Sequence, residues 1–102
     1  MKIEARILVS RCSHDLCASV ILRGRAFDTL ILARDCLNLC ETLKSRGYMY
    51  ELRYSTGDCS CNLPKPPRTP EFLEDIMVFL EKLTGTISEL KLIRVKLENH
   101  YR

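Results

Sequence analysis

The sequence predicts one small α+β domain, in which a mixed sheet of about four strands packs with two amphipathic helices in the order β-β-α-β-α-β. Three observations predict this class. Short segments alternate apolar and polar residues, longer segments repeat apolar residues every three or four positions, and isolated glycines stand between them. With 102 residues, 46% hydrophobic and 28% charged, the chain has room for one core, so we expect residues 1–102 to form a single domain.

The first two strands are expected to form a hairpin near the amino end. Residues 2–11 alternate apolar and polar side chains, which is typical of a half-buried strand. Residues 18–22 form a second expected strand that is apolar on both sides. Residues 13–16 between them have the length of a hairpin link. A helix over 14–22 is the alternative, but the β-branched residues in that segment favour a strand.

The clearest predicted helix covers residues 26–46. Its apolar residues fill one half of a helical wheel, except for Phe27 and Ile31, and Gly47 follows as a stop signal. Residues 48–55 then alternate again, which predicts the third strand.

The remainder of the chain predicts a loop, a helix and a last strand. Residues 58–69 carry three prolines and are expected to form an ordered internal loop, and residues 70–84 a second helix ended by Gly85. Residues 86–98 are ambiguous, because a capping box at their start indicates a third helix and alternation at their end indicates a strand. We favour the strand, with a frayed tail at 99–102, and expect both helices to cover one face of the sheet.

The composition indicates a source and a compartment. The chain has no Gln and only three Asn, and depletion of these amides is a thermophile trait. Six cysteines agree with this, because intracellular proteins of hyperthermophiles are often rich in disulfides. The chain shows neither the apolar stretch of a secretory signal nor an apolar run of the roughly 20 residues that cross a bilayer. We therefore expect a cytoplasmic protein of a hyperthermophilic archaeon, or of a virus of such a host, with no membrane partner.

The cysteines occur as three pairs along the sequence. Cys12 and Cys17 flank the predicted hairpin link, so we expect a disulfide between them. Cys36 and Cys40 lie one turn apart within the apolar side of the first predicted helix, so we expect both to be small buried core residues without a metal ion.

The third pair, Cys59 and Cys61, is not assigned by spacing alone. These residues could pair with other cysteines, share a metal ion or stay free. His14, beside the hairpin cysteines, is expected to be a solvated turn residue, because no third group is evident that would orient it as a catalytic base. A metal site is the weaker alternative to disulfides, with the ligands Cys12, Cys17, Cys59 and Cys61.

Binding of RNA or another single-stranded nucleic acid is one alternative function. Tyrosines alternate along the third predicted strand, at Tyr48, Tyr50 and Tyr54, and such rings could stack on unpaired bases. The net charge of +3 permits this partner without arguing for it. The expected basic contacts are Arg23, Arg25, Lys65 and Arg68.

The favoured function is a non-catalytic interaction subunit. No catalytic or phosphate-binding motif appears, so we expect neither an enzyme nor a cofactor. The chain carries more apolar residues than a sheet covered on one face would bury, which predicts a homodimer or membership of a larger complex. A cysteine-based metal or redox protein is the remaining alternative. The candidate interface residues are Leu8, Ile21, Phe27 and Ile31.

Overall fold

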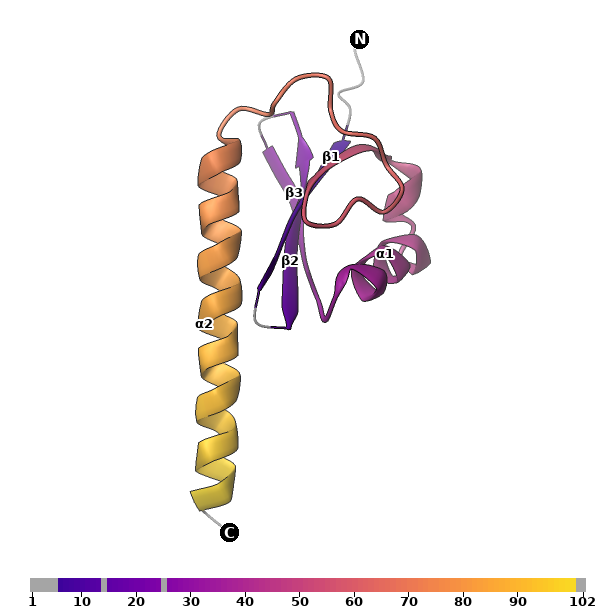
Figure 1. Cartoon of the computed structure of the whole chain (residues 1–102). Helices are drawn as coiled ribbons and strands as arrows, with labels where there is room; N and C mark the ends of the chain where they lie inside the picture. The colour runs from indigo at the N-terminus through magenta and orange to yellow at the C-terminus, as the bar shows by residue number, and fades with distance from the viewer. Residues whose placement is uncertain (1–5, 14, 25, 101–102) are drawn as a thin grey trace.

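In a computed structural model of the chain, a four-stranded sheet separates two helices (Figure 1). The structure describes residues 6–13, 15–24 and 26–100, with side chains described as far as Ser88. The predicted class, a mixed sheet with two helices, is confirmed. The elements are β1 (Arg6–Ser13), β2 (Leu16–Arg23), β3 (Ala26–Ala33), α1 (Cys36–Ser45), the short 3₁₀ helix η1 (Tyr48–Tyr50), β4 (Leu52–Gly57) and α2 (Leu73–His100).

The sheet has the strand order β3-β2-β1-β4. β1, β2 and β3 follow one another as antiparallel neighbours, and β4 pairs with β1 in parallel. The predicted amino-terminal hairpin is therefore confirmed, and its register sets Cys12 opposite Cys17. β1 and β2 are the inner strands, while β3 and β4 form the two edges.

Each face of the sheet has its own apolar core. On one face, Leu8 of β1 and Ile21 of β2 pack with Leu39 and Leu43 of α1. On the other face, Val9 and Val20 pack with Ile76 and Leu80 of α2. Successive residues of a strand point to opposite faces, so a strand covered on both sides is apolar at consecutive positions. This is the reason why residues 18–22 lack a polar side.

The two helices lie on opposite faces, and the prediction that both cover one face is wrong (Figure 1). Three of the four candidate interface residues are consequently inside the domain: Leu8 is 0% exposed, Ile21 is 2% exposed and Ile31 is 4% exposed. The apolar surplus at these positions is covered by α1 and not by a partner. Phe27 differs, with 61% of its surface exposed.

The predicted helix over 26–46 is wrong in its first third, where β3 replaces it. Residues 26–33 pair with β2, and α1 begins only at Cys36. Asp35 caps this helix, because its Oδ1 accepts a hydrogen bond of 2.7 Å from the backbone N–H of Asn38. Pairing with the hairpin decides between strand and helix for a segment whose apolar residues fit both repeats.

The predicted strand at the carboxyl end is also wrong. α2 runs without a break from Leu73 to His100, so it includes residues 86–98 and passes through Gly85. A glycine inside a helix costs only about 1 kcal/mol relative to alanine, and the contacts of Leu80 and Thr84 on the sheet side offset that cost. The carboxyl half of α2 extends beyond the sheet (Figure 1).

Gly57 tests the parallel pairing of β4 with β1. It has a φ of +100°, and a Cβ at this position would lie 2.0 Å from the carbonyl oxygen of Ser10. Backbone strain and the clash act together, so Gly57→Ala should lower the free energy of unfolding by at least about 3 kcal/mol. Gly47, with a φ of +81° and open space around it, is the matched control.

Gly47→Ala should cost only about 1 kcal/mol, since it carries the strain without the clash. Urea denaturation of the two variants and the wild type measures both values. Equal losses would show that β4 does not approach β1 as closely as described.

Candidate functional site

All six cysteines lie in the described part of the chain, and all are disulfide-bonded. Cys12–Cys17 links β1 to β2, as the hairpin spacing predicts. The other two bonds join α1 to the loop that follows β4. They are Cys36–Cys59, with Cα atoms 5.3 Å apart, and Cys40–Cys61, with Cα atoms 5.4 Å apart.

Local structure explains why the second and third bonds form side by side. Cys36 and Cys40 are one helical turn apart, so both lie on the same face of α1. Cys59 and Cys61 are separated by one residue, and Cys61 has a φ of +48°, which bends the loop along the helix. The two cysteines of α1 therefore lie opposite the two cysteines of the loop, and two neighbouring disulfides form.

Hydrogen bonds hold the loop against β1 independently of the disulfides. The backbone N–H of Cys59 donates to Ser10 Oγ at 2.8 Å, and the Ser10 hydroxyl donates to the Cys59 carbonyl oxygen at 3.2 Å. The backbone N–H of Cys12 donates to Asp58 Oδ2 at 2.7 Å. These bonds bring Cys59 from a loop to the end of the hairpin.

Two of the disulfides are in contact. Cys12 Sγ lies 3.5 Å from Cys59 Sγ and 3.7 Å from Cys36 Sγ, although it is bonded to Cys17. The Sγ atoms of these four residues all lie within 4.8 Å of one another. Four sulfurs from β1, β2, α1 and the loop thus form one cluster, which we call the sulfur cluster.

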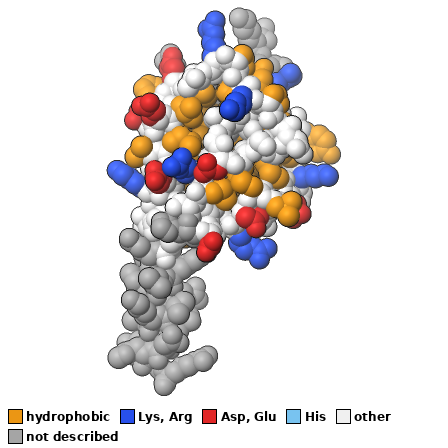
Figure 2. Space-filling view, in the orientation of Figure 1, with side chains coloured by type: hydrophobic (Ala, Val, Ile, Leu, Met, Phe, Trp, Pro, Cys, Tyr) orange, Lys and Arg blue, Asp and Glu red, His pale blue; other side chains and the backbone are white. Residues whose placement is uncertain are grey.

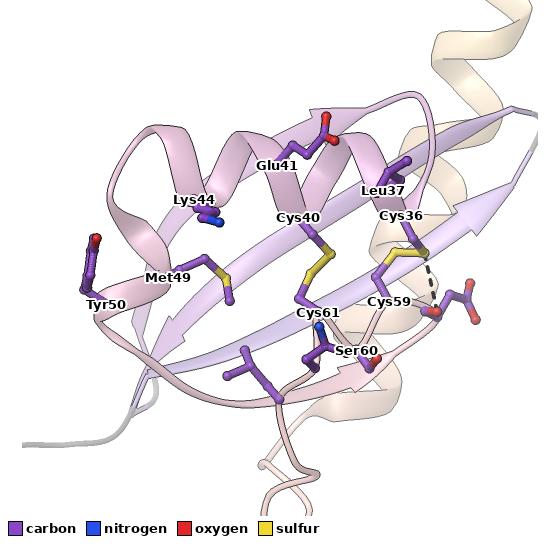
Figure 3. Close-up of a pocket in the computed structure, with 13 residues that line it drawn as sticks. Cys36, Leu37, Cys40, Glu41, Lys44, Met49, Tyr50, Cys59, Ser60 and Cys61 are labelled. Atoms are coloured by element: carbon purple, nitrogen blue, oxygen red, sulfur yellow. Dashed lines mark hydrogen bonds between the residues drawn. A yellow bond between two sulfur atoms is a disulfide. The ribbon is translucent and has the colours of Figure 1, made fainter.

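A groove of about 860 Å³ opens between α1 and the loop (Figure 3). The Cys36–Cys59 and Cys40–Cys61 bonds form part of its wall, and Met49 and Leu63 extend its apolar lining. Small reagents can therefore approach these two disulfides at the half-buried Cys36, Cys40 and Cys61, whereas Cys59 itself is buried. The groove does not include the Cys12–Cys17 bond among its lining residues.

The structure corrects two expectations about the cysteines. Cys36 and Cys40 are half-buried and bonded, not small core residues, because their side chains leave α1 toward the loop. The predicted metal set is also regrouped: Cys36 and not Cys61 lies with Cys12, Cys17 and Cys59. One sequence signal could have indicated the two neighbouring disulfides between α1 and the loop. Residues one helical turn apart and residues two positions apart in an extended chain are separated by similar distances, so Cys36 and Cys40 can match Cys59 and Cys61.

The predicted aromatic strand is not formed. Tyr48 and Tyr50 lie in η1, where Tyr48 packs against the α1 core and Tyr50 is 91% exposed, and only Tyr54 lies in β4. Acidic and basic side chains are interspersed on the face shown in Figure 2. Of the expected basic contacts, Arg23 ends β2, Lys65 and Arg68 are exposed in the loop, and Arg25 lies outside the described residues, as does His14.

A second notable surface lies on the α2 side of the sheet. In the pairing of β3 with β2, Leu30 lies opposite Val20 and Leu32 lies opposite Ala18. These leucines therefore lie on the same face of the sheet as α2, which packs over β1 and β2. Both are nevertheless exposed, at 48% and 44%, because α2 does not reach over β3. At the start of β3, a hollow of about 380 Å³ is lined by Phe27, Phe72 and Phe79. The exposed apolar residues here, which we call the β3 patch, are Phe27, Leu30, Leu32, Phe72 and Phe79.

Comparison with known proteins identifies no relative. No family model matches the chain, and neither the curated proteins nor the solved structures include a significant match. Within the described residues, no helix has the length and apolar character that a membrane span requires.

The paired disulfides between α1 and the loop generate a prediction about stability. They close loops of nearly equal size, with sequence separations of 23 and 21, so either bond restricts the unfolded chain almost as much as both. Removing one pair, by Cys36→Ser with Cys59→Ser or by Cys40→Ser with Cys61→Ser, should cost about 1 kcal/mol. Removing both pairs should cost at least about 3 kcal/mol.

Urea unfolding under non-reducing conditions measures these differences. The expected pattern is non-additive, with the fourfold variant losing more than the sum of the two double variants. Strictly additive losses would contradict the account, because each bond would then act on a separate part of the chain.

Proposed function

We propose that the chain is a non-catalytic assembly module that forms a homodimer through α2. The observation that carries this proposal is a helix much longer than the domain it covers, beside an exposed apolar patch. The occupant proposed for the β3 patch is the carboxyl half of α2 from a second copy of the chain.

The length of α2 supports the need for a partner. Its 28 residues span about 42 Å at 1.5 Å per residue. Among the described side chains, the last fully buried one is Thr84, about 24 Å before the helix ends at His100. A helical segment of this length is marginal in water without tertiary contacts. Five of the eight residues 90–97 are apolar in the sequence, which favours burial against another chain.

The sequence of α2 is complementary to itself in an antiparallel pair. Val78 and Phe79 are exposed at 48% and 47%, and Leu92 and Ile93 occupy the same heptad positions two repeats later. When Gly85 of one copy lies opposite Thr86 of the other, Val78 lies opposite Ile93 and Phe79 lies opposite Leu92. Small residues at the crossing allow the two backbones to approach closely.

Charge supports the same register. The antiparallel pairing that opposes Phe79 with Leu92 also opposes Asp75 with Lys96 and Lys82 with Glu89. Both pairs join opposite charges, and two-fold symmetry repeats each of them. A parallel pair would instead set each of these residues opposite its own copy, so like charges would meet.

The proposed dimer also covers the β3 patch. Phe79 of α2, and Phe72 just before the helix, line the same hollow as Phe27, so the side of α2 that carries Phe79 faces β3. A second helix lying along that side would rest over Leu30 and Leu32. Burying a large apolar side chain contributes about 1.5–3 kcal/mol, and symmetry doubles the set. The edge left open by α2 and the helix extending beyond the sheet are thus complementary.

The setting proposed for this module is the cytoplasm of a hyperthermophilic archaeon or of a virus of such a host. The absence of Gln and the six cysteines, all bonded, support it.

Light scattering on the purified full-length chain tests the dimer. At tens of micromolar the expected mass is twice the chain mass of 11.8 kDa. Phe79→Ser should weaken the dimer by at least about 100-fold, because it removes apolar burial at two symmetric positions. Leu37→Ser is the matched control, since Leu37 is 70% exposed on α1, on the opposite face. A wild-type chain that stays monomeric would overturn the proposal.

Exchange of charges tests the antiparallel register. Asp75→Lys sets two lysines opposite each other twice in the dimer, so it should raise the dissociation constant about 10-fold at low salt. Adding Lys96→Asp to the same chain should restore most of the wild-type affinity. Failure of the double variant to recover would exclude this register, even if the chain dimerises by another surface.

A further inference from the structure

We propose that the sulfur cluster is a redox-controlled metal site. When the Cys12–Cys17 and Cys36–Cys59 bonds are reduced, the four thiolates bind one divalent ion of the zinc class. The site is independent of the proposed dimer, because its sulfurs belong to the α1 core whereas the β3 patch lies on the other face.

The distances fit a tetrathiolate site. Zn²⁺ bound to four thiolates at about 2.3 Å in a tetrahedron sets each pair of sulfurs about 3.8 Å apart. The two contacts between the disulfides, Cys12 to Cys59 at 3.5 Å and Cys12 to Cys36 at 3.7 Å, are already close to that separation. All four sulfurs lie within 4.8 Å of one another, so reduction requires no element of the fold to move far.

The scaffold keeps the ligands together after the two bonds open. Cys12 and Cys17 stay opposite each other in the antiparallel ladder of β1 and β2. Cys59 keeps its two hydrogen bonds with Ser10. Cys36 stays at the start of α1, which Leu39 and Leu43 hold on the sheet. Four separate elements, β1, β2, α1 and the loop, thus present the four sulfurs without help from either bond, which is the preorganisation that a structural zinc site needs.

The surroundings also suit the metal. Cys17 and Cys59 are 2% and 1% exposed, so water has little access to two of the four ligands. Cys36 is the first residue of α1, where the positive end of the helix dipole favours the negative charge of a zinc tetrathiolate. Cys61 lies two residues beyond Cys59 and bonds Cys40, outside this cluster.

The reaction is balanced with a dithiol as the reductant. Two dithiols reduce the two protein disulfides, each becoming a disulfide itself, and the four protein thiols give up four protons on binding Zn²⁺. The product is a complex with a charge of −2. The groove gives the reductant access to the Cys36–Cys59 bond at Cys36, since Cys59 itself is buried (Figure 3). A thiolate released at Cys59 can then attack Cys12 Sγ, 3.5 Å away, which forms a Cys12–Cys59 disulfide and releases the thiolate of Cys17. The second dithiol then reduces this new bond to two thiols.

The experiment uses the full-length chain, reduced without oxygen by a phosphine, which offers no thiolate of its own to the metal. Zinc is measured by competition with a chromogenic chelator, and Co²⁺ is added in parallel. We expect one ion per reduced chain, with the intense thiolate-to-cobalt absorption and tetrahedral bands of four sulfur ligands. We expect no binding by the oxidised chain.

Two sets of variants make the assignment specific. Cys36→Ser should lower zinc affinity at least about 100-fold and change the cobalt spectrum, because it removes a ligand. The double variant Cys40→Ser with Cys61→Ser is the matched control and should bind zinc as the wild type does. An equal loss of zinc affinity in Cys36→Ser and in the control would refute the assignment. A loss of zinc affinity in the control alone would also refute it and would favour a ligand set that includes Cys61.

One result would contradict the metal site directly. If the reduced wild-type chain binds no zinc, whether its circular dichroism shows a folded or an unfolded protein, the cluster is a pair of disulfides only and the proposal is wrong. Binding of the same strength by the oxidised chain would overturn the redox control.

Discussion

Strands β1 and β2 carry apolar side chains on both faces, and each face therefore needs a separate layer to exclude water. Leu8 and Val9, adjacent in β1, are each 0% exposed although they belong to different cores. A sheet buried on both sides cannot be stabilised by one helix or by two helices on one face. The positions of α1 and α2 follow from this requirement, and so does the division of the molecule into a cysteine-rich side and a side without cysteines.

The two covering layers meet this requirement in different ways. α1 has only ten residues, of which Leu39 and Leu43 are buried, and covalent bonds to the loop after β4 supplement its packing. Small domains commonly need such cross-links, because their cores are limited by surface area. α2 has no disulfide. It is held on β1 and β2 by apolar contacts at every turn as far as Leu83, and then leaves the domain.

These two solutions place the two proposals on opposite sides of the sheet. On the α1 side, two neighbouring disulfides bring four Sγ atoms within 4.8 Å of one another. The sulfur cluster can therefore cross-link the fold when oxidised and, as proposed, bind a metal ion when reduced. On the α2 side, a single helix is too narrow to cover all four strands, since neighbouring strands are about 4.8 Å apart and a helix is about 10 Å wide. α2 lies over the inner strands β1 and β2, and on the edge strand β3 it leaves Leu30 and Leu32 exposed.

The sequence by itself determined the class of fold, the hairpin and the Cys12–Cys17 bond, because alternation and short links report local geometry. It could not determine whether residues 26–33 form a strand, since their apolar residues fit both repeats and pairing with β2 decides. Nor could it show that Cys36 bonds Cys59, because that bond depends on a parallel strand bringing distant residues together. Tertiary structure decided these features for one physical reason: burial depends on which elements meet, and a sequence pattern states only which side of an element is apolar.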